Sequence, residues 1–367
     1  MKQNSRQVVL VTSLALLGAP AFMRGQGTAS PGESSAGSTA ATVRPLVNPF
    51  RVATKQWFPG IRANITFPVG SAPAAGAVDN TGHVWISNGG SASVTEMLPD
   101  GVILGTFPIA AGADLANVPQ RSTVWYLAQS GGNHIWRDSA PAGTPVPAGI
   151  AFAGDSIWIA DYGRGLAVQM SLSGVVLRSV PVGLGPFAIS FNGSQVWVAN
   201  ENSNSVSVIN AANGAVAATY DTGVAPVGLE CDGEHMWISN SSSNTVVEMN
   251  FDGSTVTTFT VADPTSGLAW DGVRMWASSF AGSVVGLAPD GTSLGPIAVG
   301  AGTQGVAFNG VDWVYVAGLQ SNNVTVVRVT DGKVMAVLPV GSEPVAVIFT
   351  GINMLVTNSL GNSVSLL

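Results

Sequence analysis

A unit of about 40 residues recurs along most of this chain, and it constrains the fold more than any other feature. Its marker is a short strand of the pattern Trp-(Ile/Val)-(Ser/Ala)-(Asn/Asp), and poorer copies keep the same place in the repeat. The copies begin at Trp85, Trp125, Trp158, Trp197, Trp237, Trp276, Tyr315 and Leu355, from 33 to 40 residues apart. A period near 40 that contains only strand and turn signals is typical of a β-propeller.

Each unit reads as four antiparallel strands, which is one propeller blade. A first, apolar strand ends in Asn-Gly or Asp-Gly, a pair that suits a two-residue hairpin because both positions need positive φ. The Trp strand follows, then a Ser/Asn-rich loop, a third strand such as "SVSVIN", another Asp-Gly or Asn-Gly turn and a fourth strand such as "SVPVG". The 45 glycines and the scarcity of charge, 10% of residues, agree with short strands joined by tight turns.

The two ends of the repeat region complement each other. The last unit stops at "NSVSLL", after its third strand, while residues 63–70, "ANITFPVG", have the pattern of a fourth strand with no blade before it. Pairing the two would close the ring and leave no free blade edge. The sequence therefore predicts an all-β propeller closed by a strand at about 63–70.

The number of blades has two solutions. Eight markers predict eight blades, and this is the count that the sequence favours. The unit around Trp125 is short, however, and it has proline where its fourth strand is expected. If that unit is an insertion, the ring has seven blades.

The residues before the repeats have a different composition. Lys2 and Arg6 precede an apolar run over 8–17 and a small-x-small pattern at 19–21, so residues 1–21 are predicted to be a signal peptide. Residues 22–60 are rich in Ser, Gly, Ala and Pro and are predicted to be a flexible linker, with the propeller over 61–367. We expect export to the periplasm, the cell surface or the medium, and no transmembrane segment after signal cleavage.

The charge of the repeat region and the cysteine content exclude nucleic acid as an expected partner and an intrachain disulfide. Residues 63–367 hold seven basic against twenty acidic side chains, the opposite of a phosphate-binding surface, so nucleic acid is not an expected partner. Cys231 is the sole cysteine, so no intrachain disulfide can form. Its repeat equivalents are large and apolar, such as Phe152 and Phe191, which predicts a buried, inert thiol.

Two family resemblances rest on specific stretches. Residues 197–229, "WVANENSNSVSVINAANGAVAATYDTGVAPVGL", resemble the YVTN-family β-propeller repeats of bacterial and archaeal surface-layer and other exported proteins, and the likeness covers about residues 63–367. Residues 82–97, "GHVWISNGGSASVTEM", resemble the propeller of the streptogramin (virginiamycin B) lyases. The second resemblance implies a histidine near the start of an innermost strand, with a carboxylate and a divalent metal. The corresponding positions here, among them Phe187, Ser266 and Gln304, hold no histidine.

Polar residues at one mouth of the channel are the candidate ligand-binding residues. Symmetry places the ends of the Trp strands and the loops before the innermost strands at this mouth, and a concave mouth with convergent polar groups is the default site. The candidates are Asp161, Tyr162, Arg164, Asn200, Glu201, Asn240, Asp263 and Glu343. The asparagines have a second interpretation as turn-makers, and the charged residues have one as solvated surface groups.

Other residue types are assigned structural roles or no role. The repeated Trp residues are predicted to pack between blades. His83 and His235 share one repeat position at the hairpin end of the Trp strand, where we expect exposure rather than metal ligation, and His134 lies in the irregular second unit. No catalytic residue and no cofactor is predicted, although rim carboxylates could bind Ca²⁺ or Mg²⁺.

The sequence predicts an exported, non-catalytic module for recognition or structure at the cell envelope. We expect a monomer that binds a protein or glycan partner through its loop-rich face. The alternative is a metal-dependent lyase or hydrolase, streptogramin lyase-like or lactonase-like, with its site at the channel mouth.

Overall fold

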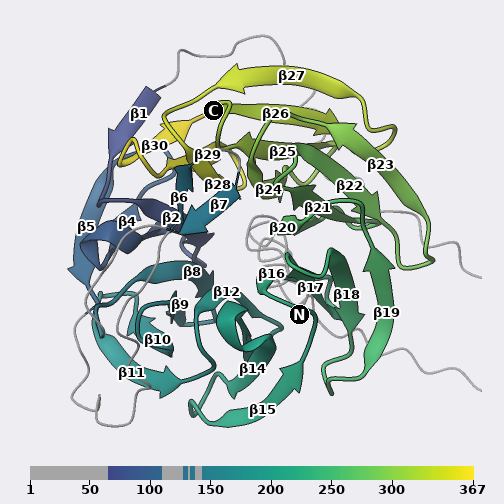
Figure 1. Ribbon diagram of the computed structural model, residues 1–367. Coiled ribbons are helices and arrows are strands. Elements are labelled where there is room, and N and C mark those ends of the chain that lie inside the picture. The colour runs from purple at the N-terminus through teal and green to yellow at the C-terminus, as the bar shows by residue number, and fades with distance from the viewer. Residues whose placement is uncertain (1–64, 110–126, 131–132, 137–142) are drawn as a thin grey trace, which may run out of the picture.

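Seven four-stranded antiparallel sheets surround a central axis and form a β-propeller (Figure 1). The structure, a computed structural model, describes residues 65–109, 127–130, 133–136 and 143–367. The predicted signal peptide and linker lie outside these residues. The all-β propeller class is confirmed. Within the described residues, no helix has the length and apolar character needed to cross a membrane.

Six blades follow the chain in order, innermost strand first. Blade 1 contains β2 (Pro73–Val78), β3 (Val84–Asn88), β4 (Ser93–Met97) and β5 (Ile103–Pro108). Blade 2 contains β8 (Pro147–Phe152), β9 (Ser156–Asp161), β10 (Leu166–Ser171) and β11 (Val176–Pro181), and blade 3 contains β12 (Pro186–Phe191), β13 (Gln195–Asn200), β14 (Ser205–Asn210) and β15 (Val216–Asp221). Blade 4 contains β16 (Pro226–Cys231), β17 (Met236–Asn240), β18 (Thr245–Met249) and β19 (Thr255–Thr260). Blade 5 contains β20 (Thr265–Trp270), β21 (Met275–Ser279), β22 (Ser283–Leu287) and β23 (Ser293–Ala298), and blade 6 contains β24 (Thr303–Phe308), β25 (Trp313–Gly318), β26 (Asn323–Arg328) and β27 (Val334–Pro339).

Blade 7 joins the two ends of the repeat region and closes the ring. Its strands are β28 (Pro344–Phe349), β29 (Met354–Asn358), β30 (Ser363–Leu366) and β1 (Ile65–Pro68), in that spatial order. The β1–β30 ladder runs antiparallel from Ile65 opposite Leu366 to Pro68 opposite Ser363. Figure 1 shows the purple β1 beside the yellow β30. The predicted closing strand is confirmed, within narrower bounds.

The ring has seven blades, the alternative to the favoured eight. Between β5 and β8 the described residues form only β6 (Leu127–Ser130) and β7 (Asn133–Trp136), which pair with each other as a separate two-stranded sheet. The preference for eight blades is therefore corrected to seven. A strand hairpin gives the same local sequence signal as half a blade, and proline at the expected fourth strand was the sign that no blade is completed there.

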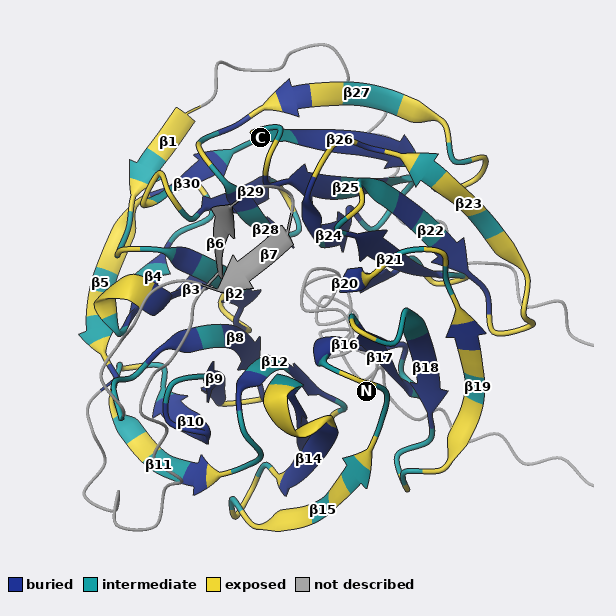
Figure 2. Cartoon of the chain, viewed as in Figure 1, coloured by how far each residue is buried: buried dark blue, intermediate teal, exposed yellow. Residues whose placement is uncertain are grey.

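The Trp side chains pack between blades, as predicted. Trp85 and Trp197 are fully buried. Trp85 shares a cluster with Ile150 and Ile157 of blade 2, and Trp197 shares one with Met236 of blade 4. Figure 2 shows the inner strands mostly buried and the outermost strands largely exposed. The core of this protein is therefore a set of interblade layers around the axis.

Innermost strands of adjacent blades approach each other at backbone distance. A Cβ placed on Gly267 of blade 5 would lie 2.5 Å from the Gln304 carbonyl oxygen of blade 6, and one on Gly305 would lie 2.5 Å from the Val345 carbonyl oxygen of blade 7. The hydroxyl of Ser278 donates a hydrogen bond to that same Gln304 carbonyl. The third position of each innermost strand holds glycine or alanine, and at Gly267 and Gly305 the spacing between blades leaves room for glycine alone.

The close approach of the innermost strands predicts the effect of a substitution at Gly267. Gly267→Ala should lower the free energy of unfolding by about 1–3 kcal/mol, because the added methyl group overpacks backbone that cannot move without shifting blade 6. The measurement is urea denaturation followed by tryptophan fluorescence. Gly89→Ala is the matched control, since its Cβ would meet Pro147 oxygen at an ordinary 3.4 Å, and we expect a change within about 0.5 kcal/mol. Equal effects of the two substitutions would contradict the close-approach argument.

Candidate functional site

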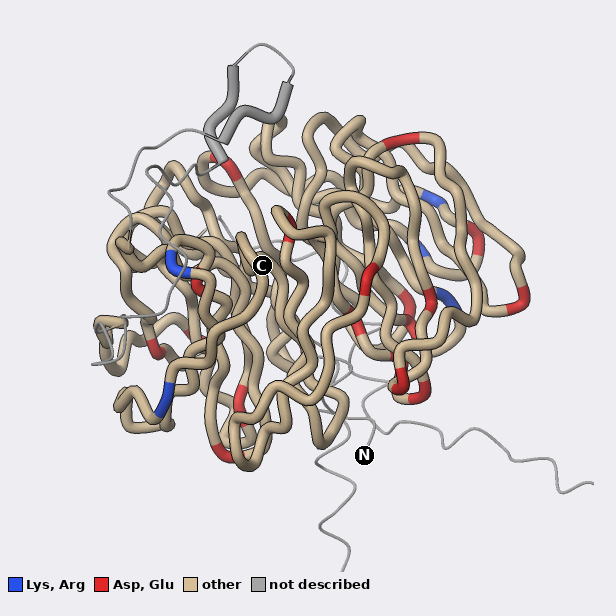
Figure 3. The backbone as a smooth tube through the Cα atoms, turned by 60° about the horizontal axis from the view of Figure 1, so that its bottom comes forward, with Lys and Arg blue, Asp and Glu red and all other residues tan. Residues whose placement is uncertain are grey.

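One face of the ring collects two kinds of loop from every blade. The loops between second and third strands lie against the loops that lead into the innermost strands, and backbone hydrogen bonds join them, such as Glu201 N–H to Gly185 oxygen and Ser241 N–H to Ala225 oxygen. We call this side the loop-rich face, and the opposite side, with the hairpin turns between first and second strands, the turn face. Acidic residues are spread over the described part of the chain, and basic residues are few (Figure 3).

Asp161 and Arg164 form a buried ion pair within one loop of the loop-rich face. Both side chains are inaccessible to solvent. The Arg164 Nε donates to the Asp161 carboxylate, which also accepts the Val146 backbone N–H at 2.8 Å. Burial raises the pKa of Asp161, and the Arg164 charge opposes that shift. Arg164 keeps both terminal guanidinium nitrogens buried without a hydrogen-bond partner. This pair fixes the loop that carries Tyr162.

Tyr162 and Glu201 meet at the boundary of blades 2 and 3. The Tyr162 hydroxyl accepts a hydrogen bond from Asn202 Nδ2 at 2.8 Å, and its ring lies edge-on to Phe187 with centroids 6.4 Å apart. Glu201 opens η3 (Glu201–Ser203), the 3₁₀ turn after β13. Burial raises the pKa of Glu201 to about 6, against a hydrogen bond from Tyr162 that lowers it. Its Oε2 atom is buried without a hydrogen-bond partner.

Asn200 and Asn240 are fully buried, and their side chains hydrogen-bond to groups of the fold. Asn200 Nδ2 donates to the Ser205 and Ser207 hydroxyls at 3.3 and 3.0 Å. Asn240 Nδ2 donates to Thr245 Oγ1 at 3.2 Å, and its Oδ1 accepts from a threonine hydroxyl of the preceding blade at 3.0 Å. Glycine packs directly on each amide, since a Cβ on Gly183 would lie 2.6 Å from Asn200 Cγ. These asparagines hold the loop in place, and the structure gives them no path to a ligand.

Asp263 and Glu343 lie elsewhere on the ring. Asp263 lines a cleft of about 250 Å³ between β19 and blade 5. Glu343 has φ of +54°, and its backbone N–H donates to Asn322 Oδ1 of the preceding blade at 2.8 Å. The same turn position holds Ala72 and Ala225, also with positive φ. Of the eight predicted residues, the structure thus brings together Asp161, Tyr162, Arg164 and Glu201.

The turn face carries two clusters that sequence reasoning did not assemble. Asp79, His83 and Glu96 in blade 1 place their ligand-type atoms within 4.8 Å of one another, as do Asp232, His235 and Glu248 in blade 4. The histidine side chains were expected to be exposed, but they retain only 31% and 25% exposure and face carboxylates. A glutamate thirteen residues after each histidine was the available signal. Its meaning depends on strand register, which pairs Trp85 with Glu96 and Trp237 with Glu248.

The aspartate of each cluster also has a structural role. Asp79 Oδ1 accepts the His83 backbone N–H, and Oδ2 accepts the Trp85 indole N–H at 2.9 Å. Asp232 repeats the arrangement with Trp237 at 2.9 Å. Asp271 repeats it again with Trp276, although its blade has no such histidine. The Asp of the Asp-Gly turn therefore shapes the hairpin and satisfies the buried tryptophan.

The structure also bears on two possible reactive groups, the Cys231 thiol and a histidine on an innermost strand. Cys231 is buried, and burial raises the pKa of its thiol to about 12, which agrees with the predicted inert thiol. The innermost strands β2, β8, β12, β16, β20, β24 and β28 contain no histidine. The histidine-centred site implied by the streptogramin lyase resemblance therefore has no counterpart on these strands.

Comparison with known proteins identifies the fold. No protein-family model and no curated protein matches the chain. A solved streptogramin B lyase aligns with a TM-score of 0.66 and 13% identity, over 83% of this chain and 96% of its own. A catalytically inactive histidine-to-alanine variant of virginiamycin B lyase from Staphylococcus aureus, determined with quinupristin, aligns with a TM-score of 0.64 and 14% identity, over 83% of this chain and 99% of its own. Kuenenia stuttgartiensis hydrazine synthase aligns with a TM-score of 0.62 and 14% identity, over 85% of this chain and 98% of its own. At such identities the likeness concerns the propeller fold alone.

Glu201 gives this region a measurable dependence on pH. Because its pKa rises from the ordinary 4.5 to about 6 on folding, the folded protein holds this proton more tightly. Its contribution to the free energy of unfolding therefore falls as pH rises from about 4.5 to about 6 and stays low above that window. Glu201→Gln should gain stability relative to the parent protein at pH 7.5 but not at pH 4.5, as measured by denaturant melts. An unchanged difference between the two pH values would show that Glu201 is not buried as described.

Proposed function

We propose that this protein is an exported, non-catalytic recognition module that binds its partner through the loop-rich face at the boundary of blades 2 and 3. The observation that carries the proposal is Glu201, whose buried Oε2 has no hydrogen-bond donor while Tyr162 beside it is only partly buried and Asn202 is exposed. A carboxylate oxygen in that state has a desolvation cost that a ligand hydroxyl or N–H would remove. A partner with several such donors gains most at this position.

The character of the partner follows from the neighbouring groups. The Tyr162 ring offers an apolar surface, and the Asn202 amide beside the Tyr162 hydroxyl offers both a donor and an acceptor. A hydroxyl-rich glycan or a protein loop with donor groups fits these contacts. The net negative charge of the repeat region disfavours strongly acidic partners. The signal-like and linker-like sequence before residue 61 and the YVTN-like repeats support a place at the cell envelope.

The second candidate function is a metal-dependent lyase or hydrolase at the same face. The solved streptogramin B lyases with this fold are the observation that favours it. A carboxylate whose pKa is raised to about 6 is suited to general-base catalysis, which would give Glu201 a role in that reaction. Turnover would then depend on Glu201 and on a bound cation.

Binding measurements with matched variants test the proposal. The purified protein should bind at least one class of glycan on an array or one envelope fraction, and Glu201→Gln should weaken that binding about tenfold or more, since a hydrogen bond to a charged group contributes about 1.5–3 kcal/mol. Tyr162→Phe should weaken it less. Glu234→Gln is the control, because Glu234 is exposed on the turn face.

Three outcomes would count against recognition at this site. These are the absence of binding to every glycan and envelope fraction, equal binding by the parent protein and Glu201→Gln, and weakened binding in Glu234→Gln. Chelator-sensitive cleavage of quinupristin that is lost in Glu201→Gln would favour the enzymatic alternative.

A further inference from the structure

The cluster in blade 4 combines donor atoms that suit a transition metal. Asp232 and His235 lie in the turn between β16 and β17, and Glu248 lies on β18, so two segments of the blade converge. One imidazole nitrogen and two carboxylates are ligands that Zn²⁺ accepts, whereas Ca²⁺ and Mg²⁺ prefer oxygen alone. The cluster lies on the turn face, away from the loop-rich face that carries the proposed recognition site.

Glu248 is the observation that distinguishes this cluster from an ordinary surface group. Its side chain is 1% exposed, and neither carboxylate oxygen has a hydrogen-bond partner. A buried carboxylate normally accepts several hydrogen bonds, and one without them carries a desolvation penalty. Burial raises the pKa of Glu248, the nearby Asp232 charge raises it further, and His235 lowers it. A divalent cation would compensate both carboxylates at once.

The two distances from the His235 imidazole to the carboxylates are close to those between ligand atoms on one metal ion. His235 Nδ1 lies 3.0 Å from Glu248 Oε1 and 3.6 Å from Asp232 Oδ2. Ligand atoms bound to one tetrahedral zinc ion at about 2.0–2.2 Å lie about 3.4 Å apart. The His235–Glu248 approach is close but lacks hydrogen-bond alignment, because Glu248 Oε1 has no hydrogen-bond partner. Two ligands that point at a shared ion would have such a geometry.

Asp232 keeps capacity for an ion as well. Its Oδ1 accepts the backbone N–H groups of Glu234 and His235 at 2.7 Å each, and Oδ2 accepts the Trp237 indole at 2.9 Å. A carboxylate has about four acceptor sites, so one remains on Oδ2. The three hydrogen bonds hold the group rigidly, which prepares it for coordination. His235 is 25% exposed and leaves an entry from solvent.

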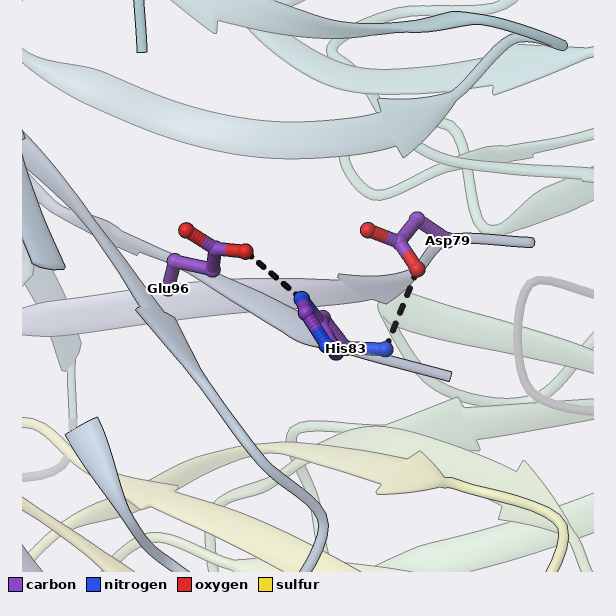
Figure 4. A group of neighbouring side chains, drawn as sticks. All are labelled: Asp79, His83 and Glu96. Carbon is purple, nitrogen blue, oxygen red and sulfur yellow. Dashed lines mark hydrogen bonds and ion pairs between the residues drawn. The ribbon is translucent and has the colours of Figure 1, made fainter. Parts of the chain in front are cut away.

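The blade 1 cluster has the same residue types but a different arrangement. His83 Nδ1 and Glu96 Oε1 form an aligned hydrogen bond of 2.6 Å, and Figure 4 shows the imidazole directed at Glu96 with the backbone N–H bonded to Asp79. Glu96 is more exposed than Glu248, at 12% against 1%. Its histidine and glutamate already satisfy each other, so this cluster is an internal control.

We propose that Asp232, His235 and Glu248 bind a single Zn²⁺ ion on the turn face of blade 4. Three protein ligands leave one position of a tetrahedral shell for water. The ion would tie the turn between β16 and β17 to β18. The inference does not depend on the recognition function, because it uses a different face and different residues.

Direct metal binding tests the site. The chain is treated with chelator, dialysed against Zn²⁺ and analysed for metal per protein, with affinity measured by competition against a chromophoric chelator. We expect one Zn²⁺ per chain. Glu248→Gln and His235→Gln should each weaken binding by more than about 100-fold, since even a residue that only orients a ligand affects affinity by about 10–100-fold. His83→Gln should leave it unchanged.

Cobalt provides a second measurement that separates loss of the site from loss of folding. Co²⁺ bound by the parent protein should show the visible absorption of a tetrahedral site, and Glu248→Gln should lose that absorption while keeping the near-ultraviolet circular dichroism of the folded ring. The absence of Zn²⁺ binding by the parent protein would overturn the proposal. So would equal binding in Glu248→Gln or loss of binding in His83→Gln.

Discussion

Backbone contact between neighbouring innermost strands is the constraint on which the rest of this structure depends. No side chain fits between Gly267 and the Gln304 carbonyl, so adjacent blades are separated by a fixed distance near the axis and diverge toward the rim. The widening wedge is filled by the buried tryptophans, and hydroxyls such as that of Ser278 bond across it. Because every blade starts from the same inner ring, its loops return to the same face. The Tyr162–Glu201 meeting point exists for this reason.

Much of the fold could be predicted from the sequence because propeller units are local. The Asp-Gly turns, the Trp strands and the unpaired strand pattern before residue 70 can each be recognised from the sequence of a single repeat. Blade number could not be derived with equal success, since a two-stranded sheet such as β6–β7 has the same turn and strand signals as half a blade. What distinguishes them is lateral pairing with two further strands, and that is a property of the folded chain.

The candidate site was harder to predict, for reasons visible in particular residues. Asp161 and Arg164 look like rim charges in the sequence, but their separation of three residues lets them neutralise each other inside one turn. The repeat position of Asn200 correctly places it at the end of its strand, but its side chain points into its own blade and hydrogen-bonds to Ser207. His235 and Glu248 are thirteen residues apart, and only the register of β17 with β18 makes them neighbours. Position in a repeat predicts which end of a strand a residue occupies, whereas burial and partners depend on the wedge around it.

The seam in blade 7 also determines how the ring would respond to mechanical load. β1 contributes four residues to the closing ladder, and its pairing begins with Ile65 opposite Leu366. Tension applied through the chain that precedes Ile65 reaches this ladder before it reaches any complete blade. Force directed away from the ring separates the Ile65–Leu366 pair first and converts the closed ring into an open arc with a free edge on β30. A propeller tethered by its amino-terminal segment therefore has a built-in release point at the strand that joins its two ends.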